Sequence, residues 1–331
     1  MTKIGIVGAG AIGGWLGALL CQVPGVQLSA LARGATLAAL QQGGISLHRK
    51  DADGKAGTLH AQVHASDQAA ALGVQDVVII SVKAPSLAAV AAQIKPMLGP
   101  ETIVLSAMNG VPWWFLQGFG GAVAGQRLRS VDADGHIALH VPVQHVVGCV
   151  VHASCSSSAP AVVQHHFGNG LIIGEPSGVV TPRVQQLLAL LQQAGFVATL
   201  SPQIQRDIWY KLWGNMTMNP ISAITGATTD TILGDDLVRS FVSQVMLEAK
   251  DIGAKIGIPI EQEPEQRHAV TLKLGAFKTS MLQDVEAGKA VELDALVGAV
   301  QELGRLTQVP TPYTDALLGL ARVHARVRGL Y

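Results

Sequence analysis

The sequence predicts an α/β protein with an N-terminal doubly wound sheet and an all-α C-terminal domain. Apolar runs of strand length alternate with helical stretches over residues 1–200, the pattern of a parallel sheet covered by helices. A glycine-rich turn joins the first strand to the first helix. After Ser201 and Pro202 nearly every segment has helical periodicity. We therefore expect domains at residues 1–200 and 201–331.

Composition supports two well-buried domains that act on a small molecule. At 331 residues the chain exceeds the size of a single core. It is 49% hydrophobic and 14% charged, with a formal net charge of +0, so we expect neither disorder nor a nucleic-acid or membrane partner. Cys21, Cys149 and Cys155 form no disulfide or zinc pattern, which favours a reducing cytoplasm. A homodimer and a monomer both fit the apolar helical half.

The N-terminal segment could be an export signal or a nucleotide-binding turn. Lys3 followed by an uncharged stretch imitates a signal peptide. Six of the seventeen residues in 4–20 are glycine, however, and this argues against an export segment. Residues 4–7 have the pattern of a short buried strand and residues 11–21 that of a helix, so we predict a strand, a tight turn and a helix.

The glycine positions indicate a dinucleotide-binding (Rossmann) turn. Gly8 permits the turn, Gly10 lets a pyrophosphate approach the backbone, and Gly13 lets the helix pack closely on the strand. The helix N-terminus supplies N–H groups and a positive dipole end. The alternative is a turn that serves packing alone. The predicted cofactor-binding residues of this turn are Gly8, Ala9, Gly10, Ala11, Ile12 and Gly13.

The end of the second strand favours NADP(H) over NAD(H). An NAD-binding protein usually has Asp or Glu there, about twenty residues after the glycines, to hold the ribose. Arg33 occupies this position and could instead accept a 2′-phosphate. A solvated arginine at the start of a helix is the other interpretation.

The rest of the first half continues the alternation. Lys83 and Asn109 end two buried strands, at the sheet edge where ligands gather. We expect helices at 34–42, 86–98 and 182–195, a hairpin over 45–65 turning at Asp53 and Gly54, and strands at 76–83, 102–110, 145–154, 161–167, 170–175 and 196–200. Residues 118–143 form an excursion ending in a small hairpin. His145, His152, His165 and His166 lack metal-ligand spacing, so we predict no metal site.

The second half contains two candidate chemical groups. We expect helices at 202–225, 235–257, 262–287, 292–308 and 313–327. Lys211, Asn215 and Asn219 lie four residues apart on one helical face in apolar surroundings, which suits proton transfer and polar recognition, although a surface stripe is the alternative. Ser280 and Glu292 flank a helix end, where Glu292 could also serve the helix dipole alone.

The motifs "GAGAIGG", "SVKAPS", "SAMNGV", "WYKLWGNMTMNPISAITG" and "TSMLQDVEAGKAVELDALVG", in this order, resemble the ketopantoate reductase family from end to end. The resemblance implies a Rossmann domain, a C-terminal domain like that of 6-phosphogluconate dehydrogenase, and an active site between them. It implies that Lys211 is the general acid and that Glu292 binds the terminal hydroxyl of the substrate. The resemblance also implies that Asn215, Asn219, Ser280 and Asn109 bind the substrate, that Lys83 and Asn109 bind the nicotinamide, and that Arg33 binds the 2′-phosphate.

The implied reaction is NADPH-dependent reduction of 2-dehydropantoate (ketopantoate) to pantoate, with Lys211 donating the proton. The region after "MNG" is longer and more aromatic than the compact family pattern, which leaves the choice of substrate open. Two alternatives remain open: a reductase of another 2-oxo acid, or an opine-type dehydrogenase, on the same scaffold. A third, from another class, is a non-catalytic NADP(H)-binding regulator.

Overall fold

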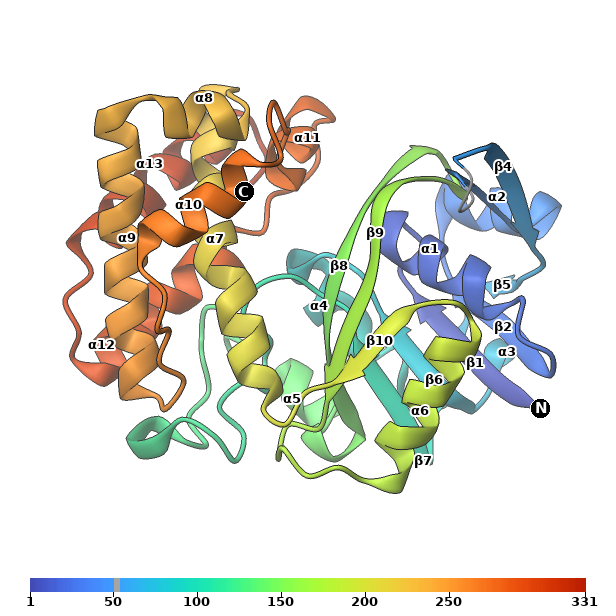
Figure 1. Ribbon diagram of the computed structural model, residues 1–331. Coiled ribbons are helices and arrows are strands. Elements are labelled where there is room, and N and C mark those ends of the chain that lie inside the picture. The colour runs from blue at the N-terminus through green and yellow to red at the C-terminus, as the bar shows by residue number, and fades with distance from the viewer. Residues whose placement is uncertain (51–53) are drawn as a thin grey trace. The chain divides into compact units, whose positions relative to one another are not determined.

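A computed structural model describes residues 1–50 and 54–331 as two compact units (Figure 1). Unit 1 comprises Met1–Met108 and His136–Ile204, and unit 2 comprises Asn109–Gly135 and Gln205–Tyr331. The sequence predicts one boundary between residues 200 and 201, with everything before it in the first domain. The structure differs because the segment Asn109–Gly135 packs with the helices of unit 2, where the rings of Phe115 and Trp209 lie 6.1 Å apart.

Unit 1 contains one mixed sheet of ten strands among the described residues. The strands are β1 (Thr2–Val7), β2 (Val26–Leu31), β3 (Ile45–Lys50), β4 (Ala56–Ala61), β5 (His64–Ser66), β6 (Gln75–Ile80), β7 (Leu98–Ser106), β8 (Val146–Ala159), β9 (Val162–Gly174) and β10 (Val197–Leu200). Their order is β4-β3-β9-β8-β7-β6-β1-β2-β5, with β10 paired to β9. The run from β5 to β8 is parallel, so the predicted doubly wound arrangement is confirmed there.

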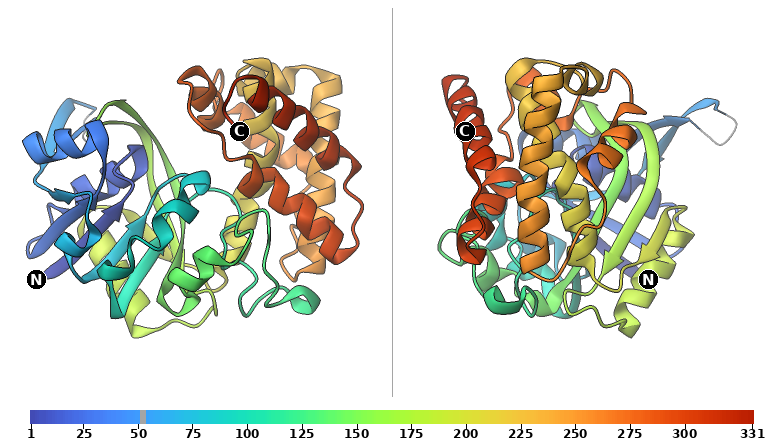
Figure 2. Two further views of the ribbon diagram at one scale, coloured as in Figure 1. Left: turned by 180° about the vertical axis from the view of Figure 1, so that it is seen from behind. Right: turned by 60° about the vertical axis from the view of Figure 1, so that its left-hand side comes forward.

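The helices of unit 1 connect these strands. They are α1 (Ala11–Leu20), α2 (Gly34–Gly43), α3 (Ala69–Leu72), α4 (Ala84–Ala91), α5 (His136–His140) and α6 (Pro182–Gln193), with 3-10 turns η1 (Lys95–Met97) and η3 (Val143–His145). In Figures 1 and 2 the long β8–β9 hairpin curls beside α1. Trp15 of α1 fills this space: its ring stacks on His165 at 5.8 Å and meets Phe196 edge-on at 5.0 Å. A helix covered on so many sides has to be apolar, which explains its uncharged sequence.

Two local predictions in the first half have different outcomes. The hairpin is confirmed over residues 45–61 as the antiparallel pair β3 and β4, whereas residues 64–66 form β5, which pairs in parallel with β2. The hairpin's turn residue Asp53 lies outside the described residues. The small hairpin expected within 118–143 is wrong: that stretch contains η2 (Gly121–Val123), α5 and the beginning of η3, and no strand is found in this fully described segment. Its apolar residues Val123 and Leu128 are buried without forming a strand.

Unit 2 is helical apart from its first segment. Its helices are α7 (Ile204–Thr225), α8 (Thr229–Gly234), α9 (Asp236–Lys255), α10 (Pro264–Leu272), α11 (Ser280–Glu286), a π-helical turn η4 (Asp294–Gly298), α12 (Ala299–Thr307) and α13 (Pro312–Val327). The predicted helix 262–287 is two helices, because the chain breaks near Gly275, which has φ +62°. The predicted helix 235–257 begins at Asp236, where Asp235 caps α9 by accepting from Val238 N–H.

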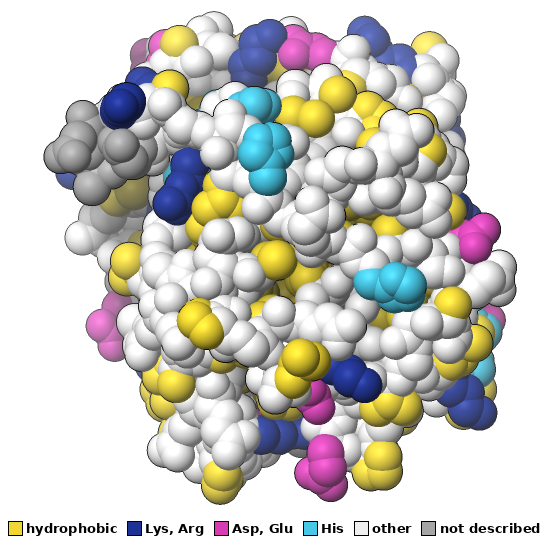
Figure 3. Space-filling view, turned by 90° about the vertical axis from the view of Figure 1, so that its right-hand side faces the viewer, with side chains coloured by type: hydrophobic (Ala, Val, Ile, Leu, Met, Phe, Trp, Pro, Cys, Tyr) yellow, Lys and Arg dark blue, Asp and Glu magenta, His cyan; other side chains and the backbone are white. Residues whose placement is uncertain are grey.

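The helices and one face of the surface show how apolar and charged side chains are distributed. No helix in the described ranges is long and apolar enough to cross a bilayer. On the face drawn in Figure 3, Lys and Arg side chains are scattered among acidic and apolar ones and form no continuous basic patch.

Candidate functional site

The glycine turn of unit 1 is shaped by contacts that exclude side chains at two positions. Gly8 has φ +98°, and a Cβ there would lie 2.7 Å from the backbone N of Val82. A Cβ on Gly13 would lie 2.2 Å from the Gly8 carbonyl oxygen and 2.3 Å from Ser81 Oγ. Both glycines are therefore required by the packing of β1, α1 and the end of β6.

The N-terminus of α1 has room for an anion. A Cβ on Gly10 would meet no atom within 4 Å, so the space beside its backbone is open. Gly10 is the N-cap, no side chain caps the helix, and the first turn carries no acidic residue. Unoccupied N–H groups and the helix dipole together favour a phosphate here. The intervening Ala9, Ala11 and Ile12 present only small or apolar side chains.

Two cationic side chains that are predicted to bind the cofactor lie at the carboxyl ends of parallel strands. Arg33 follows β2 as the N-cap of α2 and is exposed. Lys83 follows β6 as the N-cap of α4 and is half-buried. Since β2, β1 and β6 are neighbours, both residues lie at the same sheet edge as the glycine turn. This is the edge at which doubly wound sheets bind ligands.

In unit 2 a hydrogen bond joins two of the predicted site residues. Lys211 Nζ donates to Asn109 Oδ1 at 2.8 Å, and both side chains are half-buried. Helix α7, which carries Lys211, is fixed to α9 by two indole bonds: Trp209 Nε1 donates to the Ala249 carbonyl and Trp213 Nε1 to the Met246 carbonyl. The ammonium group is therefore held at a defined position on a rigid helix.

Asn109 is positioned by the residues that follow it. Val111 N–H donates to the Ala295 carbonyl of the π-helical turn at 2.8 Å. Gly110 has φ +82°, and a Cβ there would lie 2.6 Å from the same carbonyl oxygen. Farther along, the Glu302 carboxylate accepts from the backbone N–H groups of Arg129 and Ser130, at 2.8 Å each. The segment that bears Asn109 is thus attached to η4 at one end and α12 at the other.

The two asparagines that follow Lys211 along helix α7 differ in exposure. Asn215 is half-buried, whereas Asn219 is only 5% exposed. Within the described part of the chain, no side-chain hydrogen bond is found for either amide. The Asn219 amide is not among the fully buried polar groups without a partner in the described residues, so water or a ligand can still reach it. Asn219 is therefore suited to ligand recognition.

Ser280 and Glu292 come from the segment between α11 and η4. Ser280 is exposed at the first position of α11, whose N-cap Thr279 accepts from Leu282 N–H at 3.2 Å. Glu292 is half-buried and precedes η4, and its carbonyl accepts from Leu296 N–H. A π-turn widens the helix locally and is frequent at functional sites.

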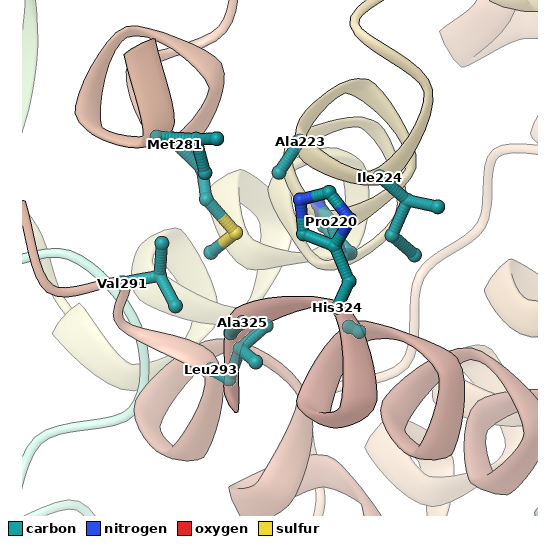
Figure 4. Close-up of a pocket in the computed structure, with 10 residues that line it drawn as sticks. Pro220, Ala223, Ile224, Met281, Val291, Leu293, His324 and Ala325 are labelled. Carbon is teal, nitrogen blue, oxygen red and sulfur yellow. The ribbon is translucent and has the colours of Figure 1, made fainter. Parts of the chain in front are cut away.

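A small apolar pocket shows that these elements converge within unit 2 (Figure 4). It is lined from α7 by Pro220 and Ala223, from α11 by Met281, and from the approach to η4 by Val291. Three of these residues directly follow or precede predicted site residues Asn219, Ser280 and Glu292 in the chain. His324 of α13 also lines the pocket, and its buried Nε2 has no hydrogen-bond partner among the described residues.

Sequence reasoning assigned no role to three residues that hold the site together. Ser81 Oγ donates to the Gly8 carbonyl at 2.8 Å and so supports the glycine turn from β6. Gly110 and Glu302 position the Asn109 segment. Ser81 and Gly110 stand inside the motifs "SVKAPS" and "SAMNGV", which was the available signal; nothing local distinguishes Glu302. Across the described ranges no cluster of three His, Cys, Asp or Glu residues could hold a metal ion.

Comparison with known proteins identifies the family. Residues 4–178 match the model for ketopantoate reductase PanE/ApbA, and residues 203–325 match its C-terminal model. A 2-dehydropantoate 2-reductase from Mesorhizobium japonicum is 44% identical over 329 residues, covering 99% of each chain. Another, from a Nostoc species, is 28% identical over 91% of this chain and 90% of its own.

Solved structures agree with this assignment. A candidate ketopantoate reductase from Ralstonia solanacearum MolK2 is 55% identical, covers 100% of this chain and 99% of its own, and superposes with a TM-score of 0.93. A ternary structure of D-mandelate dehydrogenase with NADH and anilino(oxo)acetate shares the fold, with a TM-score of 0.84 at 20% identity over all of both chains. The chain belongs to the ketopantoate reductase family.

Proposed function

We propose that this protein reduces ketopantoate to pantoate with NADPH. The observation that carries the proposal is the Lys211 ammonium, held by Asn109 at 2.8 Å on a helix face that continues into Asn215 and Asn219. A positioned proton donor beside unsatisfied amides suits reduction of a polar carbonyl compound. Membership of the family and the 44% identity to a 2-dehydropantoate 2-reductase support the same substrate.

The residues of unit 1 fit a nicotinamide dinucleotide with a 2′-phosphate. The open space at Gly10 and the uncapped start of α1 suit a pyrophosphate, and exposed Arg33 follows β2 where an acidic residue would favour NAD(H). NADPH, when bound, supplies the hydride for the keto carbon. Arg33 would hold the 2′-phosphate by charge-assisted hydrogen bonds, and Lys83 would face the nicotinamide side.

Lys211 would transfer the proton. As hydride adds to the keto carbon, negative charge develops on the keto oxygen, and Lys211 Nζ donates a proton to it, leaving a 2-hydroxy acid and a neutral amine. Asn109 keeps the ammonium aimed and limits its rotation. Removal of a general acid typically costs about 10²- to 10⁴-fold in rate.

The remaining polar residues would orient the substrate. Asn215, Asn219 and Ser280 would hold the carboxylate and the hydroxyl groups, and Glu292 would accept the terminal hydroxyl of ketopantoate. A site that hydrogen-bonds a substrate hydroxyl discriminates strongly against an analogue that lacks it. We therefore expect 2-oxoisovalerate, which has no terminal hydroxyl, to be a poor substrate.

The test is steady-state oxidation of NADPH with ketopantoate, 2-oxoisovalerate and pyruvate, repeated with NADH. Dominance of ketopantoate with NADPH, loss of turnover in Lys211→Ala with NADPH binding retained, and a loss of ketopantoate preference in Glu292→Gln would support the proposal. Equal rates on ketopantoate and 2-oxoisovalerate would refute the role of Glu292. Cofactor binding without oxidation on any 2-oxo acid would favour a regulator instead.

A second candidate substrate is a bulkier 2-oxo acid. The pocket between α7, α11 and α13 is apolar and adjoins the elements that carry Asn219, Ser280 and Glu292. An aromatic or long aliphatic side chain could reach it only if the pocket enlarges. Adding phenylglyoxylate to the panel separates the two: a higher kcat/KM for phenylglyoxylate than for ketopantoate would favour this candidate.

We also propose a cytoplasmic homodimer. Cys21, Cys149 and Cys155 are free thiols, which is compatible with a reducing compartment. One solved relative of the same fold, from Staphylococcus aureus, is described as a dimeric ketopantoate reductase.

A further inference from the structure

Arg267 on helix α10 is a half-buried cation without an anionic partner. Within residues 1–50 and 54–331 its guanidinium forms no ion pair and no hydrogen bond, and its Nε is buried without an acceptor. Of the guanidinium nitrogens only Nε is buried in this way, so a ligand can reach the two Nη groups. A charge held partly out of water without a counter-charge is costly, and this guanidinium is therefore suited to an anionic ligand.

Helix α7, which lies alongside α10 in Figure 1, leaves room for this guanidinium. Arg267 Cζ lies 5.2 Å from the centroid of the Tyr210 ring, and Tyr210 Oη donates to Gln262 Oε1 at 2.7 Å, which fixes the ring. A Cβ on Gly214 would lie 3.0 Å from Arg267 Nε and 3.1 Å from its Nη2. Glycine inside a helix is less stable than alanine, and the space that Arg267 needs gives a physical reason for glycine at this position.

This guanidinium borders the candidate site. Tyr210 and Gly214 directly precede Lys211 and Asn215 in the sequence of α7. Successive residues of a helix are separated by about 100° around its axis, so the face that Arg267 covers adjoins the face of Lys211 and Asn215. Arg267 therefore lies at the level of Lys211 along the helix.

The residues assigned to the substrate provide no cation for its carboxylate. Among them Lys211 is the one cation, and it is assigned to the keto oxygen, whereas Glu292 is an anion. A 2-oxo acid carries its carboxylate on the carbon next to the keto carbon. The planar fork of an arginine matches a carboxylate with two parallel hydrogen bonds, so Arg267 has the chemistry that the assigned residues lack. The assigned residues are Asn109, Lys211, Asn215, Asn219, Ser280 and Glu292.

The order of the groups along α7 agrees with this role. Val291, the residue before Glu292, lines the same pocket as Pro220, which comes nine residues after Lys211. A ketopantoate molecule with its keto oxygen at Lys211 and its terminal hydroxyl towards Glu292 extends towards the end of α7. Its carboxylate, on the other side of the keto carbon, then points towards the beginning of α7, where Arg267 lies over Tyr210.

We propose that Arg267 binds the carboxylate of the 2-oxo acid substrate, and that Tyr210 and Gly214 position its guanidinium. The inference rests on the proposed function and names the cationic group that this function leaves open. It implies that the enzyme selects free 2-oxo acids over their neutral esters.

The test is steady-state oxidation of NADPH with ketopantoate, 2-oxoisovalerate and the neutral ester ethyl 2-oxoisovalerate. Arg267→Met should raise KM for the two acids about 10- to 100-fold and leave kcat nearly unchanged, because the lost charge-assisted bond exists in both the ground state and the transition state. Its kcat/KM for the ester should not change, so the preference of the wild type for acid over ester should disappear. An equal loss on acid and ester, or an unchanged KM for the acids, would overturn the proposal; the latter is also the result expected if Arg267 binds a free inorganic anion instead.

Two further variants separate position from charge. Arg206→Met is the matched control, because Arg206 is an exposed arginine one turn before Tyr210 and its loss should leave KM for the acids unchanged. A rise in KM equal to that of Arg267→Met would show a general effect of charge and refute the proposal. Gly214→Ala keeps every charge but displaces the guanidinium, so it should raise KM for the acids and not affect the ester. Thermal melting checks that each variant folds, and Gly214→Ala decides if Arg267→Met does not; unchanged KM values for the acids in Gly214→Ala would refute the position assigned to Arg267.

Binding distinguishes a failure of this inference from a failure of the proposed function. If the wild type oxidises NADPH with none of the three compounds, the proposed function fails, and isothermal titration calorimetry with 2-oxoisovalerate in the presence of NADPH decides the role of Arg267. Binding at least about 10-fold weaker in Arg267→Met than in the wild type would support that role. Equal binding by both proteins, or no binding by the wild type, would overturn it.

Discussion

Replacing Gly110 by alanine tests whether the segment after β7 positions the proton donor. Gly110 has φ +82°, and an added Cβ would lie 2.6 Å from the Ala295 carbonyl oxygen. To restore ordinary contact at about 3.5 Å, the segment has to retreat from η4 by roughly 1 Å. The Val111–Ala295 hydrogen bond of 2.8 Å would then exceed hydrogen-bond length, and Asn109 would move away from Lys211.

The expected loss follows from the bond that holds Lys211. A hydrogen bond to a charged group is worth about 1.5–3 kcal/mol, and each 1.4 kcal/mol is a factor of ten. If Asn109 aims the ammonium at the developing alkoxide, kcat should fall roughly 10- to 100-fold in Gly110→Ala. KM for NADPH should change less than kcat, because the glycine turn and Arg33 belong to unit 1 and only the predicted nicotinamide contact of Asn109 is displaced.

Gly118→Ala provides the matched control. Gly118 lies in the same segment with φ +71°, but a Cβ there would meet no atom within 4 Å. Both variants incur the left-handed backbone cost of about 1–2 kcal/mol, so both should lower Tm by several degrees. Only Gly110→Ala should also lose kcat, measured as NADPH oxidation with saturating ketopantoate. Equal kcat values for the two variants would refute the positioning role of Gly110.

Three further predictions concern packing, the cofactor turn and pH. Glu302→Gln should destabilise the protein by about 1–3 kcal/mol in urea denaturation, since one of two backbone N–H groups loses its acceptor. As a control, Glu286→Gln removes an exposed ion pair with Lys278 and should cost less than about 1 kcal/mol. Equal losses of stability in the two variants would contradict the role of Glu302. Gly13→Ala should lower Tm, whereas Gly10→Ala should keep Tm and weaken NADPH binding in a fluorescence titration; equal Tm values for the two would refute the steric account. Burial, helped by the charge of Arg239, lowers the pKa of His268 from 6.5 to about 4. The unfolded chain therefore takes up this proton at higher pH than the folded chain, so the free energy of unfolding should fall by up to about 3 kcal/mol as pH drops from about 6.5 towards 4. His268→Asn should flatten this pH dependence, and an unchanged slope would exclude His268 as its source.

Features set by local geometry could be predicted from the sequence. Gly8 and Gly13 belong to one strand–turn–helix unit, so their spacing was sufficient to infer the turn, although Ser81 and Val82, which follow β6, also exclude side chains there. The face shared by Lys211, Asn215 and Asn219 follows from helical periodicity alone. In both cases the backbone conformation is set by residues that are close together in the chain.

Features that depend on packing between distant parts of the chain could not be predicted from the sequence. The segment Asn109–Gly135 has the composition of a loose loop. Its place in unit 2 depends on long-range packing such as the contact between the rings of Phe115 and Trp209. The Lys211–Asn109 bond spans 102 positions. The resemblance to a family put both residues in one site, but no pattern in the sequence indicated that they touch, or that Gly110 and η4 hold them together.

The division of the chain into units also divides the proposed reaction. Every residue assigned to the substrate belongs to unit 2. This includes Asn109, although Asn109 comes only three residues after the end of strand β7 of unit 1. The pyrophosphate turn and Arg33 belong to unit 1. Had Asn109–Gly135 stayed with the sheet, Lys211 would lack the group that aims it. Since the segment packs on η4 and α12 instead, substitutions there should change kcat more than NADPH affinity, and substitutions in the glycine turn should do the reverse.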